Sequence, residues 1–171
     1  NGLTCHALDA KTAQTVREYT HVLTSEQASE TERLIPRHGV LTKKTKSGKY
    51  GLKDPSVVWE FLGLADNRLI GTLGFDAANL KHNGMAIPHQ SRYIFAYDKT
   101  TGEKAWEIKL DNTVMPTAIV CDEENLYFID RTDEWTYHAV RRRGDKDDFR
   151  SKLVAVRLAD GDTVWTHDGL A

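Results

Sequence analysis

Cysteine is scarce in this sequence, and the two cysteines present lie far apart. Cys5 and Cys121 are too few for a framework of disulfide bonds, and neither belongs to a CxxC pair of the kind that binds zinc or exchanges electrons. We therefore interpret both as small buried hydrophobic residues.

The sequence also lacks a long apolar run and an excess of one charge. No stretch of about 18 apolar residues is present, so no segment is expected to span a bilayer. The net charge of -2 gives no electrostatic reason to expect a nucleic-acid partner. The remaining composition, with 40% hydrophobic and 28% charged residues over a length of 171, is typical of one soluble globular domain.

The ends of the sequence carry no targeting or start signal. The sequence begins with Asn1 rather than with a methionine, and its first residues lack the basic and apolar regions of a signal peptide. The last residues, 169–171, directly follow a strand-like segment. We therefore expect the chain to be a piece of a longer protein.

What the sequence does contain is a repeated pattern of strand, turn and strand. The stretch AYDKTTGEKAW at residues 96–106 aligns with residues 155–165 and, less well, with residues 7–17. A repeat of this kind decides the architecture. The complete pattern is A-x-D-x-x-x-G-x-x-x-W, and its members are Ala96, Asp98, Gly102 and Trp106 in the complete copy, Ala155, Gly161 and Trp165 in the last copy, and Ala7 and Asp9 in the first.

Each part of the pattern has a structural reason. A strand with apolar residues at nearly every position is expected where both sheet faces are covered, and its alanine lets a neighbouring layer come close. In the turn, glycine can take a positive φ and aspartate can accept hydrogen bonds from backbone amides. The tryptophan of the return strand has an indole N–H that needs a partner when it is buried.

A further hairpin precedes each of the last two copies. Residues 57–74 break into two apolar runs at Asp66-Asn67, and residues 117–130 break between Asp122 and Asn125. Two successive hairpins make a four-stranded antiparallel meander. We therefore predict an all-β fold of ten short strands, organised as β-propeller blades.

The prediction divides the chain into about two and a half blades. Residues 1–19 supply the last two strands of an incomplete blade, and residues 20–56 form a linker with a short helix. Residues 57–110 form a complete blade with an insertion at 75–92, and residues 111–171 form another with an insertion at 131–151.

Within the linker, the run SEQASETERL favours a helix that ends before Pro36. Ser29 and Glu32 have capping-box spacing near this run. The basic stretch TKKTKSGKYGLK at residues 42–53 is expected to be an exposed loop, and a contact with an anionic partner is the alternative.

The repeated pattern closely resembles the tryptophan-docking motif of pyrroloquinoline quinone (PQQ) repeat proteins. Their β-propellers include quinoprotein alcohol dehydrogenases and a scaffold lipoprotein of outer-membrane assembly. The resemblance implies that Trp106 and Trp165 are structural residues that pack against an adjacent blade. Docking is expected to be weaker where Ala13 and Arg17 replace glycine and tryptophan, and where Arg157 replaces aspartate.

The resemblance also implies a larger, closed propeller in an exported protein. Closed propellers have more blades than this chain supplies. The missing blades are expected in the rest of the parent chain, in a second copy or in another protein. Because open apolar blade faces would be exposed, the isolated piece is expected to self-associate. A periplasmic or extracellular location is expected from the resemblance alone.

The first insertion brings several potential ligand residues together. Asp76, His82, Asn83 and His89 are close in sequence, but the spacing of the two histidines matches no closed metal site. We therefore expect no metal here and interpret the segment as a polar rim loop, in which His82 and His89 are candidate contacts to a partner.

The second insertion combines aromatic side chains with three consecutive arginines and a following DKDD run. Guanidinium groups beside aromatic rings suit a carboxylate or a phosphate. The acidic run nearly neutralises them, so a solvated loop that faces a partner is the preferred interpretation. Its candidate contacts are Trp135, Arg141, Arg142 and Arg143.

The sequence shows no catalytic or cofactor-binding constellation. Quinoprotein dehydrogenases use a vicinal disulfide, a stacking tryptophan and a Ca²⁺ site, and no residue set in this chain maps onto these features. A Gly-rich phosphate loop and a G-x-S-x-G elbow are also missing. We favour a non-catalytic propeller module that binds a protein or polymer partner. The alternative is a segment of a PQQ-dependent periplasmic alcohol or sugar dehydrogenase whose ligands for PQQ and Ca²⁺ lie outside this chain.

Overall fold

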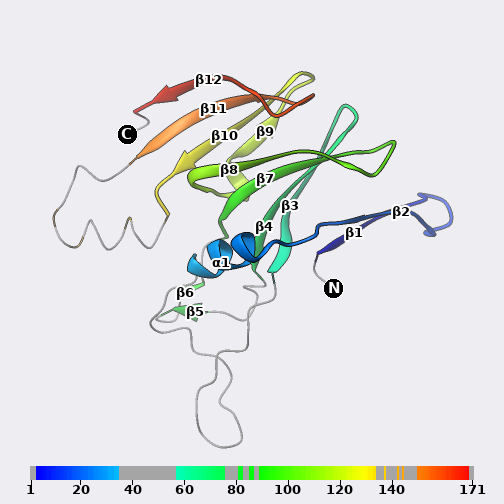
Figure 1. The fold of residues 1–171 in the computed structure, drawn as a ribbon, viewed down its shortest axis with the longest axis horizontal. Helices are drawn as coiled ribbons and strands as arrows, with labels where there is room; N and C mark the ends of the chain where they lie inside the picture. The colour runs from blue at the N-terminus through cyan, green and yellow to red at the C-terminus, as the bar shows by residue number, and fades with distance from the viewer. Residues whose placement is uncertain are drawn as a thin grey trace, which may run out of the picture.

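The protein is built almost entirely from antiparallel strands (Figure 1). The computed structural model describes residues 3–34, 57–75, 81–82, 85–86, 89–133, 137, 142, 144 and 150–169. The all-β prediction is confirmed, and both predicted hairpins upstream of the repeats are present. No helix in the described part of the chain is long and apolar enough to cross a membrane.

The first hairpin consists of β1 (Thr4–Leu8) and β2 (Thr15–Thr20), which pair only with each other in the sheets described. Helix α1 (Ser25–Arg33) follows within the segment predicted to be helical. The predicted capping box at Ser29 and Glu32 is wrong. Thr24 caps the helix instead, because its Oγ1 accepts the Gln27 amide at 3.1 Å and the Gln27 side chain accepts the Thr24 amide at 2.9 Å.

The first meander consists of four antiparallel strands in sequence order. They are β3 (Val57–Ala65), β4 (Arg68–Phe75), β7 (Ser91–Asp98) and β8 (Lys104–Val114). The first insertion leaves this sheet between β4 and β7 and contains the two-residue strands β5 (Lys81–His82) and β6 (Met85–Ala86), which pair with each other.

The second meander repeats the same order. After the 3-10 turn η1 (Pro116–Ala118) come β9 (Ile119–Cys121), β10 (Asn125–Arg131), β11 (Ser151–Arg157) and β12 (Thr163–Asp168). Each strand pairs with the next in antiparallel fashion. The second insertion leaves between β10 and β11, so both insertions connect the second and third strands of a meander.

In the described part of the chain, strand pairing links the two meanders at a single pair of residues. Arg131 of β10 pairs with Thr113 of β8, which links the strands into the continuous order β12-β11-β10-β8-β7-β4-β3. The Thr113 hydroxyl donates to the Arg131 carbonyl at 3.0 Å, and buried Asp130 accepts the Asn112 amide at 2.9 Å. Within the described strands the sheet is open at β12 and β3 and does not close on itself.

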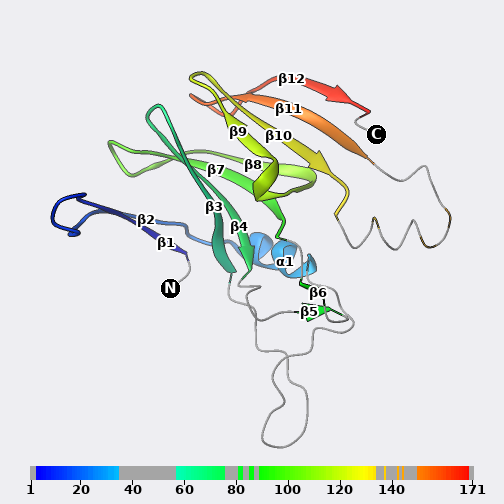
Figure 2. The ribbon, with the colours of Figure 1, turned by 180° about the vertical axis from the view of Figure 1, so that it is seen from behind.

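The first meander lies between the first hairpin and the second meander (Figures 1 and 2), and it has a hydrophobic core on each face. In one core, Ile70, Ala96 and Trp106 of the first meander pack against the second meander. On the other face, aromatic side chains including Phe95 and Tyr97 pack against the first hairpin. The molecule is therefore a stack of hairpin, first meander and second meander.

The two cysteines lie one beside each core. Cys5 packs against the core shared with the first hairpin, and Cys121 against the core shared by the two meanders. Both are unpaired, and both are half-buried rather than fully buried. Their predicted role as interior hydrophobic residues is thus only partly realised.

Candidate functional site

The three turns of the repeat share one backbone structure. In the complete copy, the Asp98 amide donates to Glu103 O at 2.9 Å and the Gly102 amide to Asp98 O at 2.8 Å. The same two hydrogen bonds recur in the first hairpin (Asp9 to Gln14, Ala13 to Asp9) and in the last copy (Arg157 to Asp162, Gly161 to Arg157), all between 2.8 and 2.9 Å. The aligned positions are therefore structurally equivalent even where the residue differs.

The fifth residue of each turn has a positive φ. The angle is 82° at Gly102, 80° at Gly161 and 55° at Ala13. Glycine takes this conformation without steric cost, whereas an alanine in it costs roughly 1–2 kcal/mol. The first copy therefore keeps the turn at an energetic cost that the other two avoid.

Aspartate at the first position of the turn organises the loop. Asp98 Oδ1 accepts the amides of Thr100 and Thr101 at 2.8 and 2.9 Å, and Asp98 Oδ2 accepts the Arg68 guanidinium at 3.0 Å. The Thr101 amide and the other donors hold the pKa of Asp98 below its usual range. Where Arg157 replaces this aspartate, Asp160 accepts the Asp162 amide at 3.0 Å instead.

Trp106 joins the first meander to the second. Its indole N–H donates to Leu158 O at 2.8 Å, and only 7% of the residue is exposed. The ring lies directly on Gly161, because a Cβ added to that glycine would come within 2.9 Å of Cδ2 of Trp106. Real Cβ atoms are not found at such distances, so the contact requires glycine.

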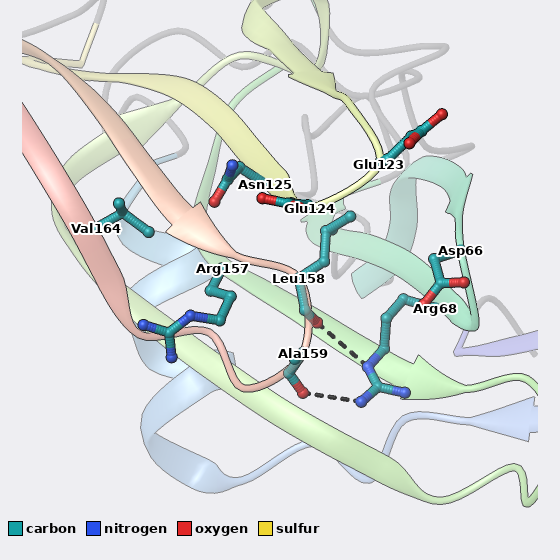
Figure 3. Close-up of a pocket in the computed structure, with 9 residues that line it drawn as sticks. All are labelled: Asp66, Arg68, Glu123, Glu124, Asn125, Arg157, Leu158, Ala159 and Val164. Carbon is teal, nitrogen blue, oxygen red and sulfur yellow. Dashed lines mark hydrogen bonds between the residues drawn. The ribbon is translucent and has the colours of Figure 1, made fainter.

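Arg68 reinforces the same interface and was not singled out from the sequence. Its Nε donates to Leu158 O at 3.2 Å and its Nη2 to Ala159 O at 2.8 Å, as Figure 3 shows. Leu158 O therefore accepts one hydrogen bond from Trp106 and one from Arg68, which uses both lone pairs of a carbonyl. Only the fold could reveal this role, because Arg68 is 90 residues away from Leu158 in sequence.

An open groove of about 450 Å³ lies beside these contacts. Both meanders contribute to it, and side chains of both charge signs surround it (Figure 3). Arg68 and Arg157, which line it, already make hydrogen bonds to the protein itself. The lining residues are Asp66, Arg68, Glu123, Glu124, Asn125, Arg157, Leu158, Ala159 and Val164.

The interface between the first hairpin and the first meander has the same layout with different side chains. Arg17 occupies the tryptophan position, and a Cβ on Gly102 would lie 2.8 Å from its Nη1. The carbonyl of Lys99, which is equivalent to Leu158 O, accepts the hydroxyl of Tyr19 at 3.3 Å. A flexible arginine and a tyrosine thus replace the rigid tryptophan.

Each meander has a row of four directly opposed residues that includes the alanine and the tryptophan of the repeat. Directly opposed residues lie on the same face of a sheet. We call these the docking rows. They are Gly63, Ile70, Ala96 and Trp106 in the first meander, and Val120, Tyr127, Ala155 and Trp165 in the second.

The two docking rows differ in burial. The row of the first meander is covered by the second meander, and Ile70 and Ala96 are fully buried. In the row of the second meander, Val120 is 64% exposed and Trp165 is 42% exposed. The Trp165 ring lies 5.9 Å from that of Tyr127, between ring centroids. Ala155 of this row is fully buried, but none of its four residues belongs to either of the two hydrophobic cores among the described residues.

Of the histidines predicted as rim contacts, His89 can be placed in detail. It is exposed, and its Nδ1 lies 2.7 Å from Oε1 of Glu60, whose side chain is only 5% exposed. Burial raises the pKa of Glu60 to about 7, although the bond to His89 opposes this shift. The other carboxylate oxygen has no hydrogen-bond partner among the described residues. Glu60 was not predicted, since nothing in sequence links strand β3 to this loop.

The remaining predicted rim contacts are less defined. His82 lies on β5, and its side chain falls outside the described residues, as do Trp135, Arg141 and Arg143. Arg142 is exposed. The described residues contain no group of three or more histidine, cysteine, aspartate or glutamate side chains that could hold a metal ion.

No model of a known protein family matches this chain, and no curated protein sequence matches it.

Proposed function

We propose that this chain is part of a PQQ-like repeat β-propeller and acts as a non-catalytic binding or scaffold module. Each meander is one blade, and the first hairpin belongs to another. The remaining blades lie in the parent chain or in a second copy, and the protein works in the periplasm or outside the cell. The sequence pattern A-x-D-x-x-x-G-x-x-x-W supports the family, and the stacked fold supports the architecture.

The observation that carries the proposal is the repetition of one docking geometry in one direction. The residue at the tryptophan position of each unit covers the fifth turn residue of the next unit, at Arg17 on Gly102 and again at Trp106 on Gly161. Units that dock in this way can be added in series, and each contacts only its neighbours. Radial repetition of four-stranded sheets is the arrangement of a propeller.

The strand order also explains how such a module would present a binding surface. Both insertions follow the second strand of a meander, whereas the docking turns follow the third strand. In an antiparallel meander these two connections lie at opposite ends of the sheet. One rim is therefore committed to docking and the other carries the variable loops, which is where repeat proteins commonly bind partners.

Titration with a cofactor separates this function from that of a quinoprotein dehydrogenase. PQQ and Ca²⁺ would be added to the full-length protein that carries this chain, while quinone absorbance and dye-linked alcohol oxidation are followed. We expect neither saturable binding nor turnover. Saturable quinone binding accompanied by turnover would establish the oxidoreductase instead.

A further inference from the structure

The docking row of the second meander has the composition of a docking face but no neighbour in the described part of the chain. At the β12 end of the row, Trp165 pairs with Ala155, as Trp106 pairs with Ala96 in the first meander. Tyr127 and Val120 extend the apolar row across the sheet. Since Ile70, Ala96 and Trp106 of the equivalent row are buried against the second meander, the structure itself shows what kind of surface fits such a row.

A surface that accepts the tryptophan must meet two requirements. It must offer a backbone carbonyl to the indole N–H, as Leu158 does to Trp106 at 2.8 Å. It must also lack a Cβ at the fifth turn position, because a Cβ on Gly161 would lie 2.9, 3.0 and 3.2 Å from three carbon atoms of the Trp106 ring. These atoms belong to a rigid, buried ring that cannot move aside cheaply.

The first hairpin of a second copy would meet only the first of these requirements. Its turn has the same backbone hydrogen bonds as the Gly161 turn, so it could approach Trp165 of another copy in the same way. Its fifth residue is Ala13, with φ 55°. The Cβ of Ala13 occupies the space that a docked indole ring needs.

We infer that the docking row of the second meander is the binding surface for a further four-stranded unit with glycine at the fifth turn position, and that Ala13 prevents a second copy of this chain from binding there. The partner is thus defined by its chemistry. It has a turn with an unpaired backbone carbonyl and a glycine at the fifth position, and this turn is followed by an apolar sheet face. This inference rests on the proposed stacking of units, and it narrows the expected partners by removing the head-to-tail homodimer.

The contrast with Arg17 supports this assignment. Against Gly102 the nearest atom to an added Cβ is Nη1, the far end of a flexible side chain, and the next is 3.4 Å away. An arginine at this position can therefore adjust to a Cβ, whereas a tryptophan cannot. The tryptophan at position 165 makes the second meander selective for glycine.

The test is sedimentation equilibrium of the 171-residue chain as four variants. These are the wild type, Ala13→Gly, Trp165→Ala and the double variant. Ala13→Gly should strengthen self-association by roughly tenfold or more, the change that 1.4 kcal/mol produces. Trp165→Ala should abolish that gain and leave any association of the wild type unchanged.

Ala13→Asn is the matched control. Asparagine tolerates a positive φ but retains a Cβ, so it relieves the backbone strain without opening the space for the ring. It should associate no more strongly than the wild type. Equal association constants for Ala13→Gly and Ala13→Asn would overturn the inference, as would a wild-type association that requires Trp165.

A failure of this inference is distinguishable from a failure of the proposed stacking. The stacking is tested within one chain, by the effect of Trp106 on stability described below, and that measurement does not involve Ala13. If Trp106 proves essential while Ala13→Gly has no effect, the units dock as proposed but glycine does not select the partner of Trp165.

Discussion

The docking rows of the two meanders share the alanine and the tryptophan of the repeat, but the two tryptophans lie in different environments. Trp106 is 7% exposed beneath the second meander, whereas Trp165 is 42% exposed on the outer face. Both tryptophans pair with an alanine on the neighbouring strand. The comparison shows that the motif specifies a face capable of docking, and that a neighbouring unit determines whether this face becomes a core.

The largest effect is expected from removing the tryptophan that is covered. Trp106→Ala should lower the free energy of unfolding by about 3–5 kcal/mol, because it leaves a cavity between the meanders. Trp106→Phe should cost about 1 kcal/mol from the lost hydrogen bond, together with some packing. Urea unfolding followed by circular dichroism measures both, and an effect of Trp106→Ala below that of Trp165→Ala would contradict the docking role.

A smaller effect is expected from filling the space beneath each docked side chain. Gly161→Ala should destabilise the protein by about 2–4 kcal/mol, since the positive φ and the clash with Trp106 add together. Gly102→Ala should cost about 1–2 kcal/mol, because only the φ penalty remains once Arg17 moves. Thermal unfolding of both variants measures this difference. Equal losses of stability would show that the φ penalty alone sets the cost of both substitutions.

The opposite face of the first meander is expected to respond to pH. His21 is buried there, with its Nδ1 3.2 Å from the Tyr97 hydroxyl and its Nε2 3.7 Å from Oε2 of Glu107. Burial lowers the pKa of His21 below 6.5, although Glu107 partly opposes the shift. The unfolded chain then binds the proton more readily, so the stability contributed by His21 is complete above about pH 6.5 and decreases as the pH falls.

Unfolding in urea between pH 5 and pH 8 measures this effect when two variants are compared. His21→Gln should remove the loss of stability toward low pH. Glu60 acts in the other direction, because its pKa is raised from 4.5 to about 7 and its stabilising contribution is lost as the pH rises through that range. The wild-type profile therefore contains both effects, and Glu60→Gln should expose the dependence due to His21. If His21→Gln leaves the pH dependence of the unfolding free energy unchanged, His21 is not the source of the loss of stability at low pH.

The smallest effect is expected at the exposed row. Trp165→Ala in the chain alone should change the free energy of unfolding by less than about 1.5 kcal/mol, since only the contact with Tyr127 and partial burial are lost. The same urea titrations used for Trp106 provide the measurement. A loss as large as that of Trp106→Ala would mean that Trp165 is covered in solution.

Much of the fold could be predicted because its signals are local. The strands, the breaks at Asp66-Asn67 and near Asp122, and the position of both insertions follow from apolar runs and turn residues. The helix cap was predicted five residues too late, at Ser29 and not at Thr24, because Thr24 to Gln27 and Ser29 to Glu32 offer the same spacing.

The contacts that build the candidate site could not be predicted, because they join distant residues. Arg68 and Leu158 meet only after the two meanders stack. Gln27 and Glu107, whose side chains lie 2.8 Å apart, meet only when helix α1 packs on strand β8. The contact between the buried carboxylate of Glu60 and the exposed His89 also joins residues far apart in sequence, on β3 and just before β7. A single sequence carries no record of such pairs.

The sequence by itself determined the unit of this protein: two strands, a turn with an aspartate and a positive φ, and a tryptophan opposite an alanine. These features depend on the conformational preferences of neighbouring residues, which act within a few positions of the chain. Only the tertiary structure decided that Trp106 is buried on Gly161 while Trp165 faces outward. Burial depends on what stands on the other side of the sheet, and that is a property of the stack rather than of the repeat.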